Sequence, residues 1–157
     1  MDITLLQIGK TFFDYINKGV KDYEQRINRY VKLETITLTT PAKYSKLGKE
    51  QLKEKESLLL WEKIVKKYDY IILLDEAGKE LTSVQFAQKL EKLLLASHKH
   101  IVFVIGGAYG VTDEFKRKCD FILSLSKMTF SHQLVRLVFA EQLYRAFTII
   151  NNENYHH

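Results

Sequence analysis

Apolar runs and amphipathic stretches alternate along most of the chain. Residues 3–8, 68–74 and 100–105 are nearly continuous apolar runs closed by glycine or aspartate, which is typical of strands buried on both faces. Residues 31–40, rich in threonine and isoleucine, and residues 120–125 are predicted as further strands. Helices are predicted over 12–30, 50–67, from 82 to about 94, briefly from 112, and over 131–150. This order indicates an α/β domain with a mostly parallel sheet covered by helices on both faces.

The predicted last helix carries more apolar surface than packing of one side against the sheet would bury. Placed at 100° per residue, Leu134, Val138, Leu143 and Tyr144 spread around most of its circumference. A helix of this kind needs burial on two sides, and in a chain this short the simplest second side is another subunit. The pattern therefore predicts a two-fold homodimer.

Length and composition restrict the class of protein. The chain has 157 residues, of which 46% are hydrophobic and 27% charged, so we expect a single domain over 1–157 and exclude disorder. Lys and Arg number 24 against 19 for Asp and Glu, a mild basic excess that favours an anionic partner. The single cysteine, Cys119, excludes a disulfide within the chain and a cysteine-built zinc site. With no signal-like start and no membrane-length apolar run, we expect a cytoplasmic protein that needs neither membrane nor metal.

Three polar or glycine-marked turns, at residues 74–78, 105–110 and 125–130, follow predicted strands. In open α/β sheets, ligands bind at this carboxyl edge. Gly106 and Gly107 allow the backbone to approach a ligand closely, although a tight turn is the simpler interpretation of the residues alone. The glycines do not form the G-x-G-x-x-G pattern after a first strand, and no P-loop is present, so a classical dinucleotide or nucleotide site is disfavoured.

Candidate chemical groups concentrate in the last helix and the tail. His132 and Arg136 lie one turn apart on an otherwise apolar stripe, an unusual place for a basic pair unless it lines a site or an interface. Glu141 and Arg145 are also four apart, a spacing compatible with a plain surface ion pair. The tail, residues 151–157, contains tyrosine and histidine, which stack on or exchange protons with nucleobases.

Two lysine-rich stretches are candidate phosphate contacts. One carries Lys43, Lys46 and Lys49 in the most loop-like part of the chain, and the other is residues 116–118. A solvated face is the commoner meaning of such runs. If they contact the phosphates of a nucleic acid, binding falls steeply with salt.

Specific strings occur at the glycine turn, after the last predicted strand and in the last helix: IGGAYG at 105–110, SKMTFSHQ at 126–133 and EQLYRA at 141–146, followed by Tyr155 and His156. Together they resemble the bacterial ribosomal RNA large subunit methyltransferase H family, which belongs to the SPOUT class. The similarity runs along the whole chain, with Ser131 standing where proline is usual.

The resemblance implies a SPOUT α/β fold with a C-terminal trefoil knot, a homodimer and S-adenosylmethionine as cofactor. It further implies methylation of N3 of a pseudouridine in large-subunit (23S) ribosomal RNA, on the assembled ribosome. Carried over by motif, the cofactor-binding residues would be Leu74, Gly106, Leu125, Ser126, Lys127, Met128, Thr129 and Phe130.

The resemblance also implies roles for five catalytic candidates. His132 or His156 would accept the N3 proton, because an imidazole titrates near neutral pH. Arg136 or Arg145 would hold the resulting anion or a phosphate. Tyr155 would stack on the base or form a hydrogen bond with it.

Other functions stay open at this point. A SPOUT methyltransferase that acts on another RNA, such as transfer RNA, shares the cofactor site and differs only in substrate. A non-catalytic RNA-binding dimer would bind the cofactor and transfer no methyl group. A small α/β nucleotide-binding module would bind another nucleotide in place of S-adenosylmethionine.

Overall fold

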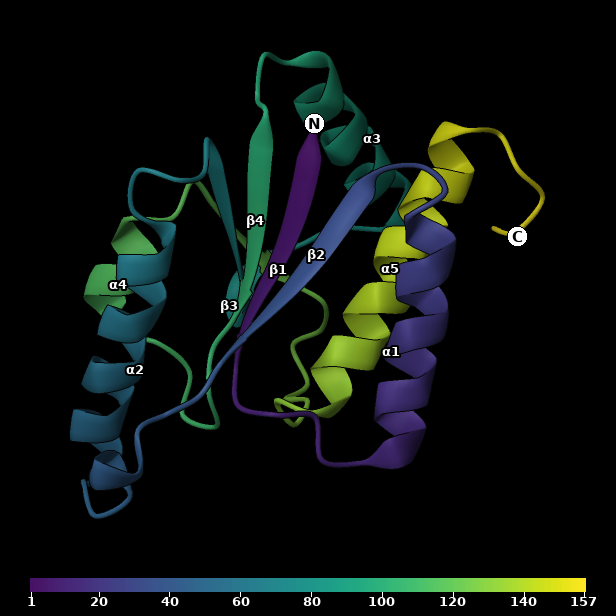
Figure 1. Cartoon of the computed structure of the whole chain (residues 1–157). Helices are drawn as coiled ribbons and strands as arrows, with labels where there is room; N and C mark the ends of the chain where they lie inside the picture. The colour runs from purple at the N-terminus through teal and green to yellow at the C-terminus, as the bar shows by residue number, and fades with distance from the viewer.

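The computed structural model describes residues 1–157, and Figure 1 shows one sheet between two layers of helices. The strands are β1 (Asp2–Ile8), β2 (Lys32–Leu38), β3 (Tyr70–Glu80), β4 (His100–Ile105) and β5 (Phe121–Ser124), in the order β2-β1-β4-β3-β5. Every neighbouring pair is parallel. The predicted parallel sheet is therefore confirmed, and the carboxyl ends of β4, β3 and β5 lie side by side. The trefoil knot stays a prediction.

Helices cover both faces of the sheet, as the alternating pattern predicted. Figure 1 shows α1 (Asp14–Ile27), α3 (Ser83–Leu95) and α5 (Leu134–Ile150) on one side, and α2 (Lys49–Ile64) and α4 (Asp113–Arg117) on the other. Two apolar clusters fill the two spaces, because successive strand residues point to opposite faces. No helix is both long and apolar enough to cross a membrane.

The last helix finds much of its burial within the chain. α5 packs against both α1 and α3. The contact with α1 is close: a Cβ added to Gly19 would lie 2.7 Å from Cδ1 of Leu137. Neighbouring helices thus cover part of the apolar surface that the pattern assigned to a second subunit, and the homodimer stays a prediction.

The third strand is longer than the sequence predicts. The pattern indicates an end at Leu74, but β3 continues to Glu80, and its register with β5 shifts between Leu74 and Lys79. The intervening residues bulge out of the ladder. Pairing resumes where a Cβ on Gly78 would lie only 2.6 Å from the carbonyl oxygen of Ile122, so a side chain there would displace β5. The predicted turn was wrong because polar residues look the same in a bulge and in a turn.

The start of α5 also differs from the prediction. The helix begins at Leu134 and not at Ser131. Just before it, Gln133 is buried, and its side-chain amide donates to the carbonyl of Lys10 (2.9 Å) while its carbonyl accepts from the N–H of Phe12 (2.8 Å). Gln133 thereby fastens the loop between β1 and α1 to the beginning of α5.

Candidate active site

A cleft of about 440 Å³ opens at the carboxyl ends of β3, β4 and β5. This volume is within the range of sites that bind small molecules. The bulge of β3, the loop after β4, the loop after β5 and the beginning of α5 all contribute to its wall. The three segments marked in the sequence therefore meet in one place, as the edge rule for parallel sheets predicts, although the first of them is a bulge and not a turn.

The cleft gathers most of the residues that the resemblance assigned to the cofactor. The ones that line it are Leu74, Gly106, Leu125, Ser126, Met128, Thr129 and Phe130. Lys127 does not line it. Its side chain is exposed, and its backbone N–H donates to the carboxylate of Glu80 (3.0 Å).

The loop after β5 is held by β3, in its bulge and just beyond it. The hydroxyl of Thr129 donates to the carboxylate of Glu76, and the N–H of Lys127 to that of Glu80. Within the loop, the N–H of Met128 donates to the hydroxyl of Ser126 (3.0 Å). The two loops therefore order one another. Sequence reasoning missed both glutamates, because nothing distinguishes them from other charged surface residues until β3 and β5 pair.

The glycine loop after β4 is packed from behind by α2. A Cβ on Gly107 would lie 2.1 Å from Oε2 of Glu56, and one on Gly106 would lie 3.1 Å from the carbonyl carbon of Gly110. Gly110 itself has a φ of +74°, which favours glycine. Close packing behind the loop and the conformation of Gly110 thus require glycine at these positions, which agrees with the tight-turn interpretation. The same loop also lines the cleft.

Glu56 is a buried carboxyl group that the sequence did not single out. It is 5% exposed, its Oε1 accepts from the hydroxyl of Thr40 (3.1 Å), and its Oε2 has no hydrogen-bond partner. Burial raises the pKa of Glu56, and the hydrogen bond from Thr40 offsets part of that rise. On a helix rich in lysine and glutamate, Glu56 looks like any solvated residue.

Replacing Glu56 by glutamine is expected to change how stability depends on pH. A carboxyl group with a raised pKa keeps its proton in the folded state at a pH where the unfolded chain has lost it. The free energy of unfolding of the natural protein therefore falls from about pH 4.5 upwards until the folded-state pKa is passed, by about 1.4 kcal/mol for each unit of the rise. Glu56→Gln removes this contribution. Urea unfolding between pH 4.5 and 8 measures it, and identical pH slopes for the two proteins would contradict it.

His132 and Arg136 occupy different environments although they are one helical turn apart. His132 lines the cleft, whereas Arg136 is fully buried. The guanidinium donates to the carbonyl of His132 (3.1 Å), to the hydroxyl of Thr11 (2.9 Å) and to the carbonyl of Ile8 (2.6 Å). The structure thus places Arg136 behind the cleft wall, where it joins the end of β1 to the start of α5, and its role in holding an anion stays a prediction.

The charge states of this pair follow from their burial. Burial lowers the pKa of Arg136 to about 10, so it remains a cation at neutral pH. Burial, and secondarily the nearby charge of Arg136, lowers the pKa of His132. The lowered pKa favours the uncharged imidazole, which is the form that accepts a proton.

The other three catalytic candidates form a second cluster, around Glu141. Arg145 donates to Oε1 of Glu141 through Nε (3.0 Å), and the hydroxyl of Tyr155 donates to the same oxygen (3.2 Å). The guanidinium lies 4.7 Å from the centre of the Tyr155 ring, and its Nη1 is 3.3 Å from Nδ1 of His156. Burial is the main cause of the raised pKa of Tyr155. The Glu141–Arg145 pair is thus more than a surface pair, because it holds the tail.

The two clusters lie toward opposite ends of α5. At 1.5 Å per residue, Leu134 and Arg145 are about 16 Å apart along the helix. Figure 1 shows the tail beyond the far end of α5, away from the end that adjoins the cleft. A single protomer does not bring His132 and His156 together.

Comparison with known proteins identifies the class to which this fold belongs. A family described as predicted SPOUT methyltransferase matches residues 1–156. A probable methylase family protein from Haemophilus influenzae Rd KW20 has a similar fold, with a TM-score of 0.58 and 16% identity over 99% of this chain and 72% of that one. The chain is an α/β protein of the SPOUT methyltransferase class.

Relatives with established names show to which family within this class the chain belongs. Ribosomal RNA large subunit methyltransferase H of Parabacteroides distasonis is 45% identical, with 100% of this chain and 99% of that protein aligned. The protein of the same name from Geobacter sulfurreducens is 42% identical, with 100% of each chain aligned. This chain belongs to the ribosomal RNA large subunit methyltransferase H family.

Proposed function

We propose that this protein transfers a methyl group from S-adenosylmethionine to N3 of a pseudouridine in large-subunit ribosomal RNA, on the assembled ribosome. The observation that carries the proposal is the convergence of three chain segments and the side chain of His132 on one cleft. Membership in a family of ribosomal RNA methyltransferases supports the choice of substrate class.

The residues around the cleft suit S-adenosylmethionine. Apolar side chains of Leu74, Leu125 and Val135 line it next to the backbone of Gly106 and Gly107, a combination that accepts a flat base and the polar edge of that base. When bound, the cofactor supplies a methyl group on a positively charged sulfur. The residues of the chain then have to orient donor and acceptor and exclude water.

The chain also provides groups that manage the proton of the acceptor. N3 of pseudouridine is a nucleophile only after its proton has left, and His132, which lines the cleft and has a lowered pKa, would accept that proton. Arg136 positions His132 through the hydrogen bond to its carbonyl (3.1 Å). Arg145, Tyr155 and His156 supply a cation, an aromatic ring and a second imidazole that suit a deprotonated base.

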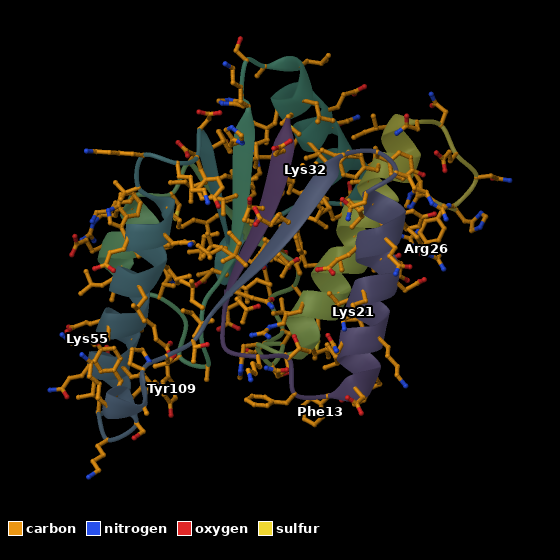
Figure 2. All side chains as sticks on the ribbon, viewed as in Figure 1. Phe13, Lys21, Arg26, Lys32, Lys55 and Tyr109 are labelled. Carbon is orange, nitrogen blue, oxygen red and sulfur yellow. The ribbon has the colours of Figure 1, made fainter.

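A second copy of the chain would unite the two clusters. Aromatic side chains remain exposed where the loop before α1 meets the cleft-side end of α5: Phe12 is 73% exposed, Phe13 49% and Tyr15 66%. Figure 2 shows Phe13 at the N-terminal end of α1. A two-fold homodimer that covers this face and sets two α5 helices in opposite directions would bring the tail of one protomer to the cleft of the other.

Transfer of labelled methyl from S-adenosylmethionine tests the proposal directly. The substrates are ribosomes that lack the modification, separated subunits, naked ribosomal RNA and transfer RNA. We expect label on the assembled ribosome, mapped to N3 of a pseudouridine. Label on transfer RNA alone would show that the substrate is transfer RNA and not ribosomal RNA. Tight cofactor binding without label on any RNA would favour a non-catalytic RNA-binding dimer.

A further inference from the structure

Lysines and tyrosines gather beside the cleft, at the start of α2 and in the short 3-10 helix η1 (Ala42–Tyr44) before it. We call this group the lysine–tyrosine patch, and its members are Lys43, Tyr44, Lys46, Lys49, Lys55 and Tyr109. Figure 2 shows Lys55 and Tyr109 at the same end of α2. The patch therefore joins a surface segment to the loop that follows β4.

The lysines of the patch lie over aromatic rings. Nζ of Lys49 is 5.4 Å from the centre of the Tyr109 ring. Nζ of Lys43 and Nζ of Lys55 are 5.3 Å and 5.9 Å from the ring of Tyr44. The attraction between a cation and a ring face is weak at exposed sites, so these lysines remain available to an anion.

The lysines of the patch have no carboxylate as an ion-pair partner. None of its lysines forms an ion pair within 4.0 Å, whereas their neighbour Lys53 pairs with Glu50 (3.0 Å). Clustered cations without counter-ions repel one another and attract a polyanion. The patch therefore favours a ligand that carries several phosphates.

The aromatic part of the patch reaches the cleft itself. Tyr109 is 46% exposed, and both Tyr109 and Lys49 line the cleft. An exposed tyrosine ring next to lysines is the combination on which unpaired bases stack while the backbone follows the cations. A regular duplex does not offer such a base, but a loop or bulge does.

We propose that the lysine–tyrosine patch docks the substrate RNA. Lys43, Lys46 and Lys55 contact backbone phosphates, and Tyr109 stacks on an unpaired base adjacent to the one that enters the cleft. The proposal rests on the proposed function for the nature of the substrate, and it adds the path by which the RNA reaches the cleft.

Binding of a synthetic stem-loop RNA, with a pseudouridine in its loop, tests the phosphate contacts between 50 and 200 mM salt. Changing Lys43, Lys46 and Lys55 together to alanine is expected to reduce the slope of log affinity against log salt by about 2 and to weaken binding at least about tenfold at low salt. The matched control changes Lys18, Lys21 and Lys92, three exposed lysines on other elements that form no ion pair, to alanine. Figure 2 places Lys21 away from the patch. Equal losses in the two triple variants would overturn the proposal.

Tyr109 tests the stacking contact. Tyr109→Phe is expected to bind the RNA within about twofold of the natural protein, and Tyr109→Ala to bind about 5- to 100-fold more weakly. Affinity for S-adenosylmethionine, measured separately by calorimetry, shows whether the cleft is intact in each variant. Equal RNA affinity of the phenylalanine and alanine variants would overturn the stacking role.

These binding assays need no methyl transfer, so the two proposals fail separately. RNA binding that depends on the patch, without transfer to any RNA, would overturn the proposed function and support the docking surface. Transfer to ribosomes by the patch variant with unchanged KM would overturn the docking surface and leave the function in place.

Discussion

Arg136→Ala is expected to lower the free energy of unfolding by about 3 kcal/mol or more. Arg136 is among the largest fully buried side chains, so its removal leaves a cavity next to the cleft. It also leaves the carbonyls of Ile8 and His132 without their donors. Denaturant unfolding followed by circular dichroism measures the effect.

Matched variants separate the causes of that loss. Arg136→Met keeps most of the volume but none of the hydrogen bonds, and Arg136→Lys keeps the charge but not the planar group that reaches three acceptors. We expect both to be more stable than Arg136→Ala and less stable than the natural protein. Arg117→Ala, at an exposed arginine, is expected to change stability by less than about 0.5 kcal/mol. An Arg136→Ala protein of natural stability that transfers no methyl group would instead indicate contact with the substrate.

His132→Ala and His156→Ala are each expected to reduce methyl transfer by about 100-fold or more, with cofactor affinity nearly unchanged for His156→Ala. If the site combines the cleft of one protomer with the tail of the other, mixing the two variants restores activity. Random exchange of subunits makes half of the dimers mixed, and each mixed dimer has one intact site of two. The mixture is therefore expected to reach about a quarter of natural activity.

The design distinguishes sites formed within a chain from sites formed between chains. A site built from one protomer gives no recovery on mixing, because each chain lacks one histidine. A double variant that carries both changes, mixed with the natural protein, is the control for subunit exchange. Full activity of the His132→Ala protein would contradict the proposal that His132 accepts the N3 proton.

Much of the cleft was predictable from the chain. Alternating apolar strands and amphipathic helices indicated a parallel sheet, and in such a sheet all carboxyl ends lie at one edge. The segments that follow Leu74, Gly106 and Leu125 therefore had to approach one another wherever their strands were neighbours. The pattern of apolar and polar residues does not show which strands are neighbours. The order of the strands in the sheet is known only from the structure.

The sequence by itself determined the α/β class, the two covered faces and the loops of the cleft, because periodicity shows which side chains avoid water. Tertiary structure alone decided what each buried group contacts. In the folded chain, β3 pairs with β5 again beyond its bulge, and Glu56 is buried against Gly107. The side chain of Arg136 points inward and donates hydrogen bonds to three oxygen atoms. Tertiary structure also separates His132 from the tail by the length of α5. These contacts join residues remote along the chain, and their energies depend on a geometry that no local pattern of residues contains.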